Sequence, residues 1–179
     1  MLKRFDENID KIQQEKTATH EYRYKLMLKT LCQLLVYSGA RVGGETNQSL
    51  IWDDIKVVVG EKKVEVGTNE NCPYDKAQVA RVEVLIRNVK YRTKPNPRLV
   101  MAIPYLERAL RAWRSETQFS SGNDFIFCHQ KDGTNGHPQS AIKTFRKGFE
   151  RFLRRHTTSK FKLWDDNESP HRTLYSLRH

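Results

Sequence analysis

Two short stretches, far apart in the chain, contain arginines in settings that suit phosphate chemistry. Residues 37–45 read YSGARVGGE and contain Arg41, and residues 50–55 follow as LIWDDI. The second stretch, residues 172–179, reads RTLYSLRH and contains Arg178. A guanidinium is a rigid, permanently charged fork that can contact two oxygens of one phosphate. Two such groups on a phosphodiester would stabilise the negative charge that develops during phosphoryl transfer.

Arg41 also has a purely structural interpretation. Glu45 and Asp54 are close to it in the sequence, and a carboxylate at either position could hold it in an ion pair. Arg41 alone leaves both interpretations open. The presence of the second stretch, with Arg178, favours phosphate contact.

The positive charge of the chain is concentrated in two segments. The net charge is +11. Residues 81–98 contain six basic residues and one acidic residue, and residues 143–162 contain eight and one. Clustered positive charge favours a polyanionic partner, because neutralising phosphates releases counterions. The alternative is two solvated basic faces without a partner.

Hydrophobic periodicity predicts the elements that position these residues. A nearly buried helix is expected from about residue 19 to Ser38-Gly39, where glycine suits a helix end. A helix is expected from Pro104 to Trp113, and a basic amphipathic helix over residues 140–153. Four apolar or alternating runs read as strands: 55–59, 64–66, 82–86 and 98–103. The aromatic and aliphatic stripe of the basic helix is expected to be core: Ile142, Phe145, Phe149 and Phe152.

This order of elements predicts one mixed α+β domain over residues 19–179, preceded by a linker or N-terminal extension at 1–18. No run of about 18 apolar residues occurs, and the first residues lack the apolar core of a secretory signal. The three cysteines are odd in number and widely spaced, which favours free thiols in a reducing cytoplasm. The histidines and cysteines show no metal-ligand spacing.

The two arginine stretches together resemble the catalytic domain of tyrosine recombinases, the phage-integrase family. Residues 37–55 are similar to that family's first box, with its T/S-G-x-R core and Leu-x-Trp-x-Asp-Ile tail. Residues 172–179 are similar to the second box, which ends Leu-Arg-His, and a basic hairpin lies between the boxes as in the family. The resemblance covers about residues 20–179. It implies a mostly helical catalytic domain with a small antiparallel three-stranded sheet, the fold of DNA breaking-rejoining enzymes.

The resemblance also implies a reaction, DNA integration by site-specific recombination. A tyrosine attacks a DNA phosphodiester, the bond to the 5′ oxygen breaks, and a 3′-phosphotyrosine forms before the strand is resealed to a different one. Arg41 and Arg178 are implied to contact the phosphate. Lys94, or Lys90 as the alternative, is implied to protonate the leaving 5′ oxygen from the hairpin. The reaction needs no metal and no cofactor.

Two further residues complete the implied site. Tyr175 stands where the family has histidine, three residues before Arg178, so its implied role is phosphate contact and not nucleophilic attack. His179 follows Arg178 and is implied to orient the site. Glu45 lies four residues after Arg41, whereas the common family pattern places the acid three after it. The family's tyrosine nucleophile would lie beyond His179, so these residues alone are expected to form an inactive, C-terminally truncated domain.

The implied partner is double-stranded DNA at recombination sites, and the full-length protein would act in a tetrameric synapse. The implied source is a phage, bacterium or mobile element, with the protein in the cytoplasm and associated with the nucleoid. The residues expected to contact DNA are basic and lie in or beside the two basic segments: Arg87, Lys90, Arg92, Arg98, Lys143, Arg146 and Lys147.

Two other functions remain open. A type IB topoisomerase relative would use similar arginine, lysine and tyrosine chemistry, and would relax supercoiled DNA without exchanging strands. A truncated, non-catalytic regulator would occupy recombination sites without cutting them. The short hairpin and the Leu-Arg-His sequence favour the recombinase over the topoisomerase.

Overall fold

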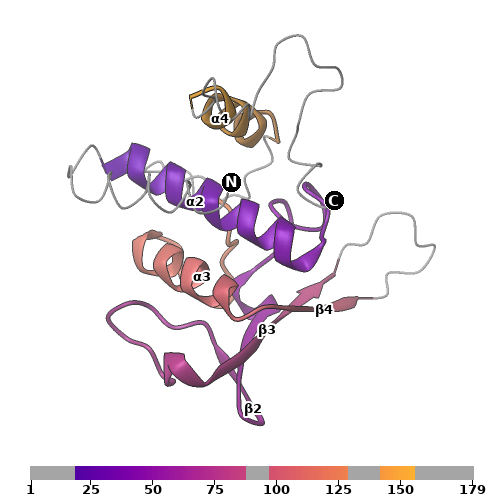
Figure 1. The fold of residues 1–179 in the computed structure, drawn as a ribbon, viewed down its shortest axis with the longest axis vertical. Helices are drawn as coiled ribbons and strands as arrows, with labels where there is room; N and C mark the ends of the chain where they lie inside the picture. The colour runs from indigo at the N-terminus through magenta and orange to yellow at the C-terminus, as the bar shows by residue number, and fades with distance from the viewer. Residues whose placement is uncertain (1–18, 88–96, 129–141, 156–179) are drawn as a thin grey trace, which may run out of the picture.

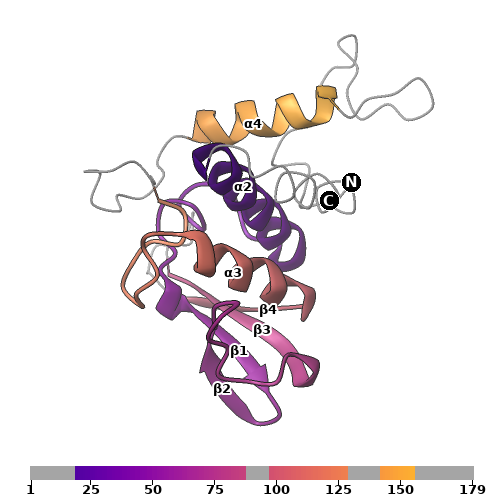
Figure 2. The same cartoon turned by 90° about the vertical axis from the view of Figure 1, so that its left-hand side faces the viewer.

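The computed structural model describes residues 19–87, 97–128 and 142–155, and their helices lie above one face of an antiparallel sheet. Helix α4, helix α2, helix α3 and the sheet follow one another in that order in both views (Figures 1 and 2). The elements along the chain are α2 (Thr19–Ser38), η1 (Trp52–Asp54), β1 (Ile55–Val59), β2 (Lys62–Glu65), η2 (Lys76–Gln78), β3 (Val79–Ile86), β4 (Arg98–Ala102), α3 (Tyr105–Glu116) and α4 (Ile142–Arg155).

Helix α2 is the buried centre of the helical part. Its apolar residues cover most of its circumference, so it packs on more than one side, as expected for a helix enclosed by other elements. The helix ends where Gly39 adopts a φ of 61° and its N–H donates to the Leu35 carbonyl at 3.0 Å. A side chain is disfavoured in that left-handed conformation, so glycine allows the chain to leave the helix here. The predicted helix and its end are confirmed.

The sheet has four strands in the order β2-β1-β3-β4, and every neighbouring pair is antiparallel. The α+β class is therefore confirmed, but the expected three-stranded sheet is wrong. The additional strand, β2, is short and mostly exposed, and it pairs only with β1 after the tight turn at Gly60. Backbone pairing with β1 holds it in the sheet, and Val64 is its one residue that packs against the core. The run 64–66 read as a strand from the sequence overlaps it.

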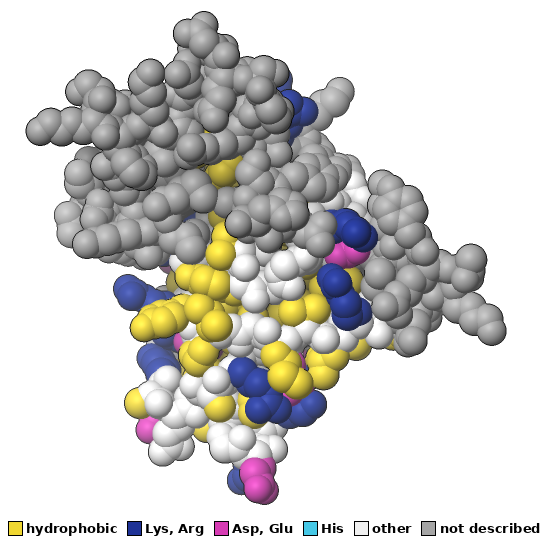
Figure 3. Space-filling view, turned by 45° about the vertical axis from the view of Figure 1, so that its right-hand side comes forward, with side chains coloured by type: hydrophobic (Ala, Val, Ile, Leu, Met, Phe, Trp, Pro, Cys, Tyr) yellow, Lys and Arg dark blue, Asp and Glu magenta, His cyan; other side chains and the backbone are white. Residues whose placement is uncertain are grey.

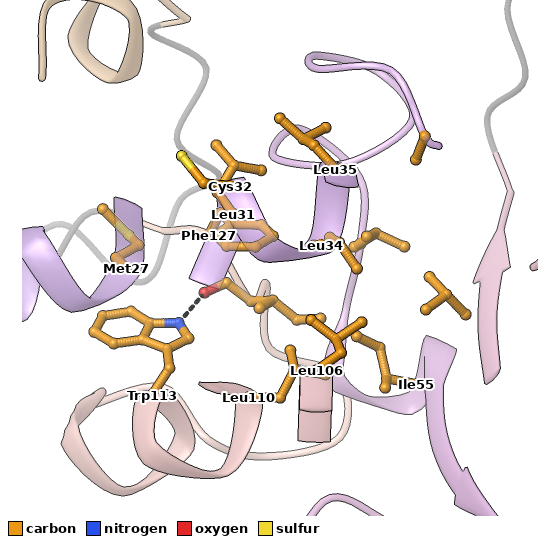
Figure 4. Packing of buried hydrophobic residues seen from close by; sticks show 14 of the residues in the cluster. Met27, Leu31, Cys32, Leu34, Leu35, Ile55, Leu106, Leu110, Trp113 and Phe127 are labelled. Carbon is orange, nitrogen blue, oxygen red and sulfur yellow. Dashed lines mark hydrogen bonds between the residues drawn. The ribbon is translucent and has the colours of Figure 1, made fainter. Parts of the chain in front are cut away.

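One face of the sheet forms the floor of the hydrophobic core. Alternate residues of β1 and β3 are fully buried there, as the period of two requires. Helix α3 begins directly after Pro104, and its Leu106, Leu110 and Trp113 lie in the same core, as predicted. Figure 4 shows Trp113 donating its indole N–H to the Ile126 carbonyl at 2.7 Å, which satisfies the polar group of a fully buried ring.

Helix α4 packs its aromatic face onto α2. Phe145 and Phe149 are buried, and the Phe145 ring stacks on Tyr24 with centroids 6.3 Å apart, which confirms that these two phenylalanines are core residues. Gly148 lies against the same tyrosine, where a Cβ atom would be only 2.6 Å from the Tyr24 hydroxyl oxygen. Burial raises the pKa of Tyr24 to about 12, although Arg151 acts in the opposite direction. The side chains of Ile142 and Phe152 lie outside the described set.

Three further expectations concern the chain as a whole. In the described ranges, no helix is long and apolar enough to cross a membrane. Cys32, Cys72 and Cys128 are all free thiols. The described residues also contain no group of three or more His, Cys, Asp or Glu side chains that could hold a metal ion.

Candidate nucleic-acid interface

Arg41 lies in the loop that follows α2, and that loop is built around the carboxylate of Glu45. The Glu45 side chain is 2% exposed. Its Oε2 accepts from the Arg41 backbone N–H at 3.0 Å, and its Oε1 accepts from Arg41 Nη1 at 3.2 Å. Arg41 is nevertheless 36% exposed, so its guanidinium is held at the surface. The ion pair considered from sequence is present, and it leaves the arginine within reach of solvent.

Buried polar side chains fix the same loop. The Gly43 N–H donates to Asn47 Oδ1 at 2.8 Å, and the Thr46 hydroxyl donates to the Arg41 carbonyl at 2.9 Å. Thr46 and Asn47 are both almost fully buried. A buried polar group is costly unless it is hydrogen-bonded, so these satisfied groups favour a single conformation for the backbone that carries Arg41.

Arg98 reaches the same carboxylate from the sheet. It is the first residue of β4 and pairs across the strands with Ile86 of β3. Its Nη2 donates to Glu45 Oε2 at 3.1 Å. Arg41 and Arg98 are far apart in sequence, yet they share one buried carboxylate. In Figure 1, the C-terminal end of α2 and the β3–β4 end of the sheet lie on the same side of the molecule, consistent with the contact between α2 and β4.

Arg87 is held by a second buried carboxylate. It follows Ile86 directly, and its Nε donates to Oδ1 of Asp54, whose side chain is fully buried. The other oxygen, Oδ2, accepts from the Ile51 backbone N–H at 3.2 Å. The Arg87 side chain remains 55% exposed.

The segment that carries Asp54 is itself anchored by tryptophan packing. Trp52 is buried, and its indole N–H donates to the Phe119 carbonyl at 2.9 Å. The guanidinium of Arg114 lies over the Trp52 ring, 5.2 Å from its centroid, in a cation–π arrangement. These contacts place the 3-10 turn η1, and with it the Asp54 carboxylate, at the start of β1.

Two arginines and one buried carboxylate thus form one cluster, the arginine cluster, at the β3–β4 end of the sheet. Its members are Arg41, Arg98 and Glu45. With two positive side chains and one negative side chain, the cluster carries a net charge of +1. The Arg87–Asp54 pair is a separate ion pair at the end of β3. A phosphate could bind here by charge-assisted hydrogen bonds from guanidinium groups whose positions are already fixed. In Figure 3, basic and acidic side chains lie side by side, with exposed hydrophobic surface between the groups.

The outer face of α4 is a second basic surface. Arg146 and Lys147 are exposed, and Arg146 Nε is 3.0 Å from Glu150 Oε1 of the same helix. The side chain of Lys143, also expected to contact DNA, lies outside the described set. The basic residues of α4 with described side chains, Arg146, Lys147, Arg151 and Arg154, therefore face solvent, while Phe145 and Phe149 are buried.

The structure brings together only part of the predicted site. Arg41 and Arg98 lie in the arginine cluster, Arg87 pairs with Asp54, and Arg146 and Lys147 lie on α4, apart from them. Six predicted residues lie outside the described ranges: Lys90, Arg92, Lys94, Tyr175, Arg178 and His179. Sequence reasoning considered Glu45 and Asp54 as partners of Arg41 alone, and it missed their contacts with Arg98 and Arg87. One signal was available, because the alternation Arg98, Val100, Ala102 places Arg98 on the core side of β4.

A scan against models of known protein families gives no match to the sequence, and a search of curated proteins gives none either.

Proposed function

We propose that this chain is the partial catalytic domain of a DNA-cleaving tyrosine recombinase, and that Arg41 contacts the phosphate that is cut. One observation carries the proposal: Arg41 is held at the surface by the same buried Glu45 carboxylate that binds Arg98, the first residue of β4. The same residue stands in the first of the two sequence boxes that resemble this family.

The chemistry assigned to the cluster is electrostatic. Attack on a phosphodiester places negative charge on the non-bridging oxygens, and fixed guanidinium groups stabilise that charge without reorganising. Arg41 suits this role because the Glu45 carboxylate and the buried loop restrict its position before DNA arrives. Arg178 is assigned to the same phosphate, and Lys94, with Lys90 as the alternative, to protonation of the 5′ oxygen.

The first test is covalent trapping. The protein as its gene encodes it is incubated with a random-sequence duplex library that carries nicks, so that the short 5′ product diffuses away and the adduct cannot reseal. We expect a protein–DNA species on a denaturing gel, linked through a 3′-phosphotyrosine. Arg41→Ala and Arg178→Ala should each abolish it while the circular dichroism spectrum stays unchanged.

Arg108→Ala is the matched control, since it removes an exposed arginine of α3 for which no ion pair is found among the described residues. It should leave the adduct yield unchanged. Three outcomes would redirect the proposal. DNA binding without any adduct would favour the non-catalytic regulator. Relaxation of supercoiled plasmid without strand exchange would favour the topoisomerase relative. Normal adduct yield with Arg41→Ala would remove Arg41 from the site.

A further inference from the structure

Arg98 has an unusual position for an arginine in a small sheet. The row of β4 residues that faces the core runs Ala102, Val100, Arg98, so Arg98 stands where a third apolar residue would fit. Its Nε is buried and has no hydrogen-bond acceptor in the part of the chain that the structure describes. The side chain is 37% exposed although its Nε is buried, and its guanidinium reaches Glu45 through Nη2.

The two carboxylate oxygens of Glu45 accept from different groups, and this pattern indicates the role of Arg98. Oε2 accepts from the Arg41 backbone N–H and from Arg98 Nη2, whereas Oε1 accepts from Arg41 Nη1. A carboxylate and a guanidinium otherwise favour a two-bond pair that uses both oxygens. Because Arg98 occupies Oε2, the contact between the two side chains of Arg41 and Glu45 runs through Oε1.

We infer that Arg98 is a positioning residue that limits how strongly Glu45 holds Arg41. The inference rests on the proposed phosphate contact by Arg41. Without Arg98, the buried charge of Glu45 has one arginine left to compensate it, and Oε2 becomes open to the Arg41 guanidinium. Arg41 then turns toward a two-bond pair with the carboxylate. A DNA phosphate must compete with that pair, so loss of Arg98 weakens phosphate binding although Arg41 itself is intact.

The test measures how DNA affinity depends on salt, since each phosphate contact contributes about 0.9 to the slope of log K against log salt. The probe is a short random-sequence duplex, and the protein is the full chain. We expect Arg98→Ala to flatten the slope by about 0.9, the same change as Arg41→Ala. The double variant Arg41→Ala/Arg98→Ala should be no flatter than Arg41→Ala alone.

The decisive variant is Arg98→Ala/Glu45→Gln. An amide carries no charge to capture Arg41, so this double variant should recover the wild-type slope. If Arg98 were needed only for folding, Arg98→Ala/Glu45→Gln would be less stable, and would bind DNA more weakly, than either single variant. Arg98→Lys keeps a positive charge beside Oε2 and should also retain the slope. Arg108→Ala, outside the cluster, controls for loss of one positive charge and should leave the slope unchanged.

Two results would overturn the inference while leaving the proposed function in place. One is a further flattening of about 0.9 when Arg98→Ala is added to Arg41→Ala, which would make Arg98 a phosphate contact in its own right. The other is failure of Glu45→Gln to restore the slope in a variant whose thermal unfolding shows that it is folded. If Arg41→Ala leaves the slope unchanged, the proposed role of Arg41 fails, and the inference fails with it.

Discussion

Replacing Arg87 with alanine should destabilise the fold, because Asp54 would remain as a buried carboxylate without its cation. The Asp54 side chain is 0% exposed, whereas Arg87 is 55% exposed. Removing one partner from a buried ion pair costs about 3–5 kcal/mol. Arg87 is half in water and the Ile51 N–H still donates to Asp54, so the loss should be smaller, about 2 kcal/mol. In a domain of this size that loss lowers the Tm by about 4–8 °C.

The assay is urea or thermal unfolding of the Arg87→Ala, Asp54→Asn and double variants, followed by circular dichroism. Asparagine keeps an oxygen that can accept from the Ile51 N–H and removes the buried charge. The double variant should therefore be about 1 kcal/mol more stable than Arg87→Ala. If the double variant is as unstable as Arg87→Ala, or less stable, then the buried charge is not the cause. Arg108→Ala should stay within about 0.5 kcal/mol of the wild type.

The same double variant separates the structural role of Arg87 from DNA contact. Arg87→Ala/Asp54→Asn removes one positive and one negative charge, so the net charge of the protein does not change. A flatter salt slope of DNA binding in this variant would assign Arg87 to a phosphate. An unchanged slope would make Arg87 a structural residue, and the sequence-based expectation that it contacts DNA would then be wrong.

Two further predictions concern stability. Gly148→Ala should stabilise α4 by about 1 kcal/mol through helix propensity, but its Cβ would lie 2.6 Å from the Tyr24 hydroxyl oxygen. Thermal unfolding should therefore show stabilisation only when Tyr24→Phe is also present. Glu83 has a lowered pKa, first through its hydrogen bond with Lys63, although burial acts in the opposite direction. The contribution of Glu83 to the free energy of unfolding is therefore present above the ordinary carboxyl pKa and is lost as the pH falls through the lowered pKa. Glu83→Gln should consequently make the stability measured in urea less dependent on pH in the acid range.

The helices and the strands could be predicted where apolar side chains recur at the period of the element. Apolar residues at helical spacing predict α2, α3 and α4, and alternation of buried and more exposed residues predicts β3 and β4. Strand β2 was predicted only as the short run 64–66, whereas the strand spans Lys62–Glu65. Its residues 62–65 are mainly exposed, and they belong to the sheet because the turn at Gly60 brings their backbone against β1. The side-chain pattern gave the right number of strand runs but not the bounds of this one, and the three-stranded sheet came from the family resemblance.

The candidate site could be predicted only where its partners are neighbours in the sequence. Arg41 and Glu45 are four residues apart, so their ion pair was among the alternatives. The Arg98–Glu45 contact joins residues separated by 53 positions. It depends on the register that pairs Arg98 with Ile86 and on the path of the loop after α2, and neither is encoded in local periodicity.

Counting charges along the sequence overstates how strongly the 81–98 segment attracts phosphate. Each of its described basic residues has a carboxylate partner: Arg81 with Glu83, Arg87 with Asp54, and Arg98 with Glu45. A phosphate that stays several ångströms away experiences nearly balanced positive and negative charge, so the electrostatic attraction is weak. A phosphate that reaches the guanidinium groups in the right geometry gains short, charge-assisted hydrogen bonds. Such paired arginines suit a site that selects one phosphate by its position, and they suit non-specific coating of DNA less well.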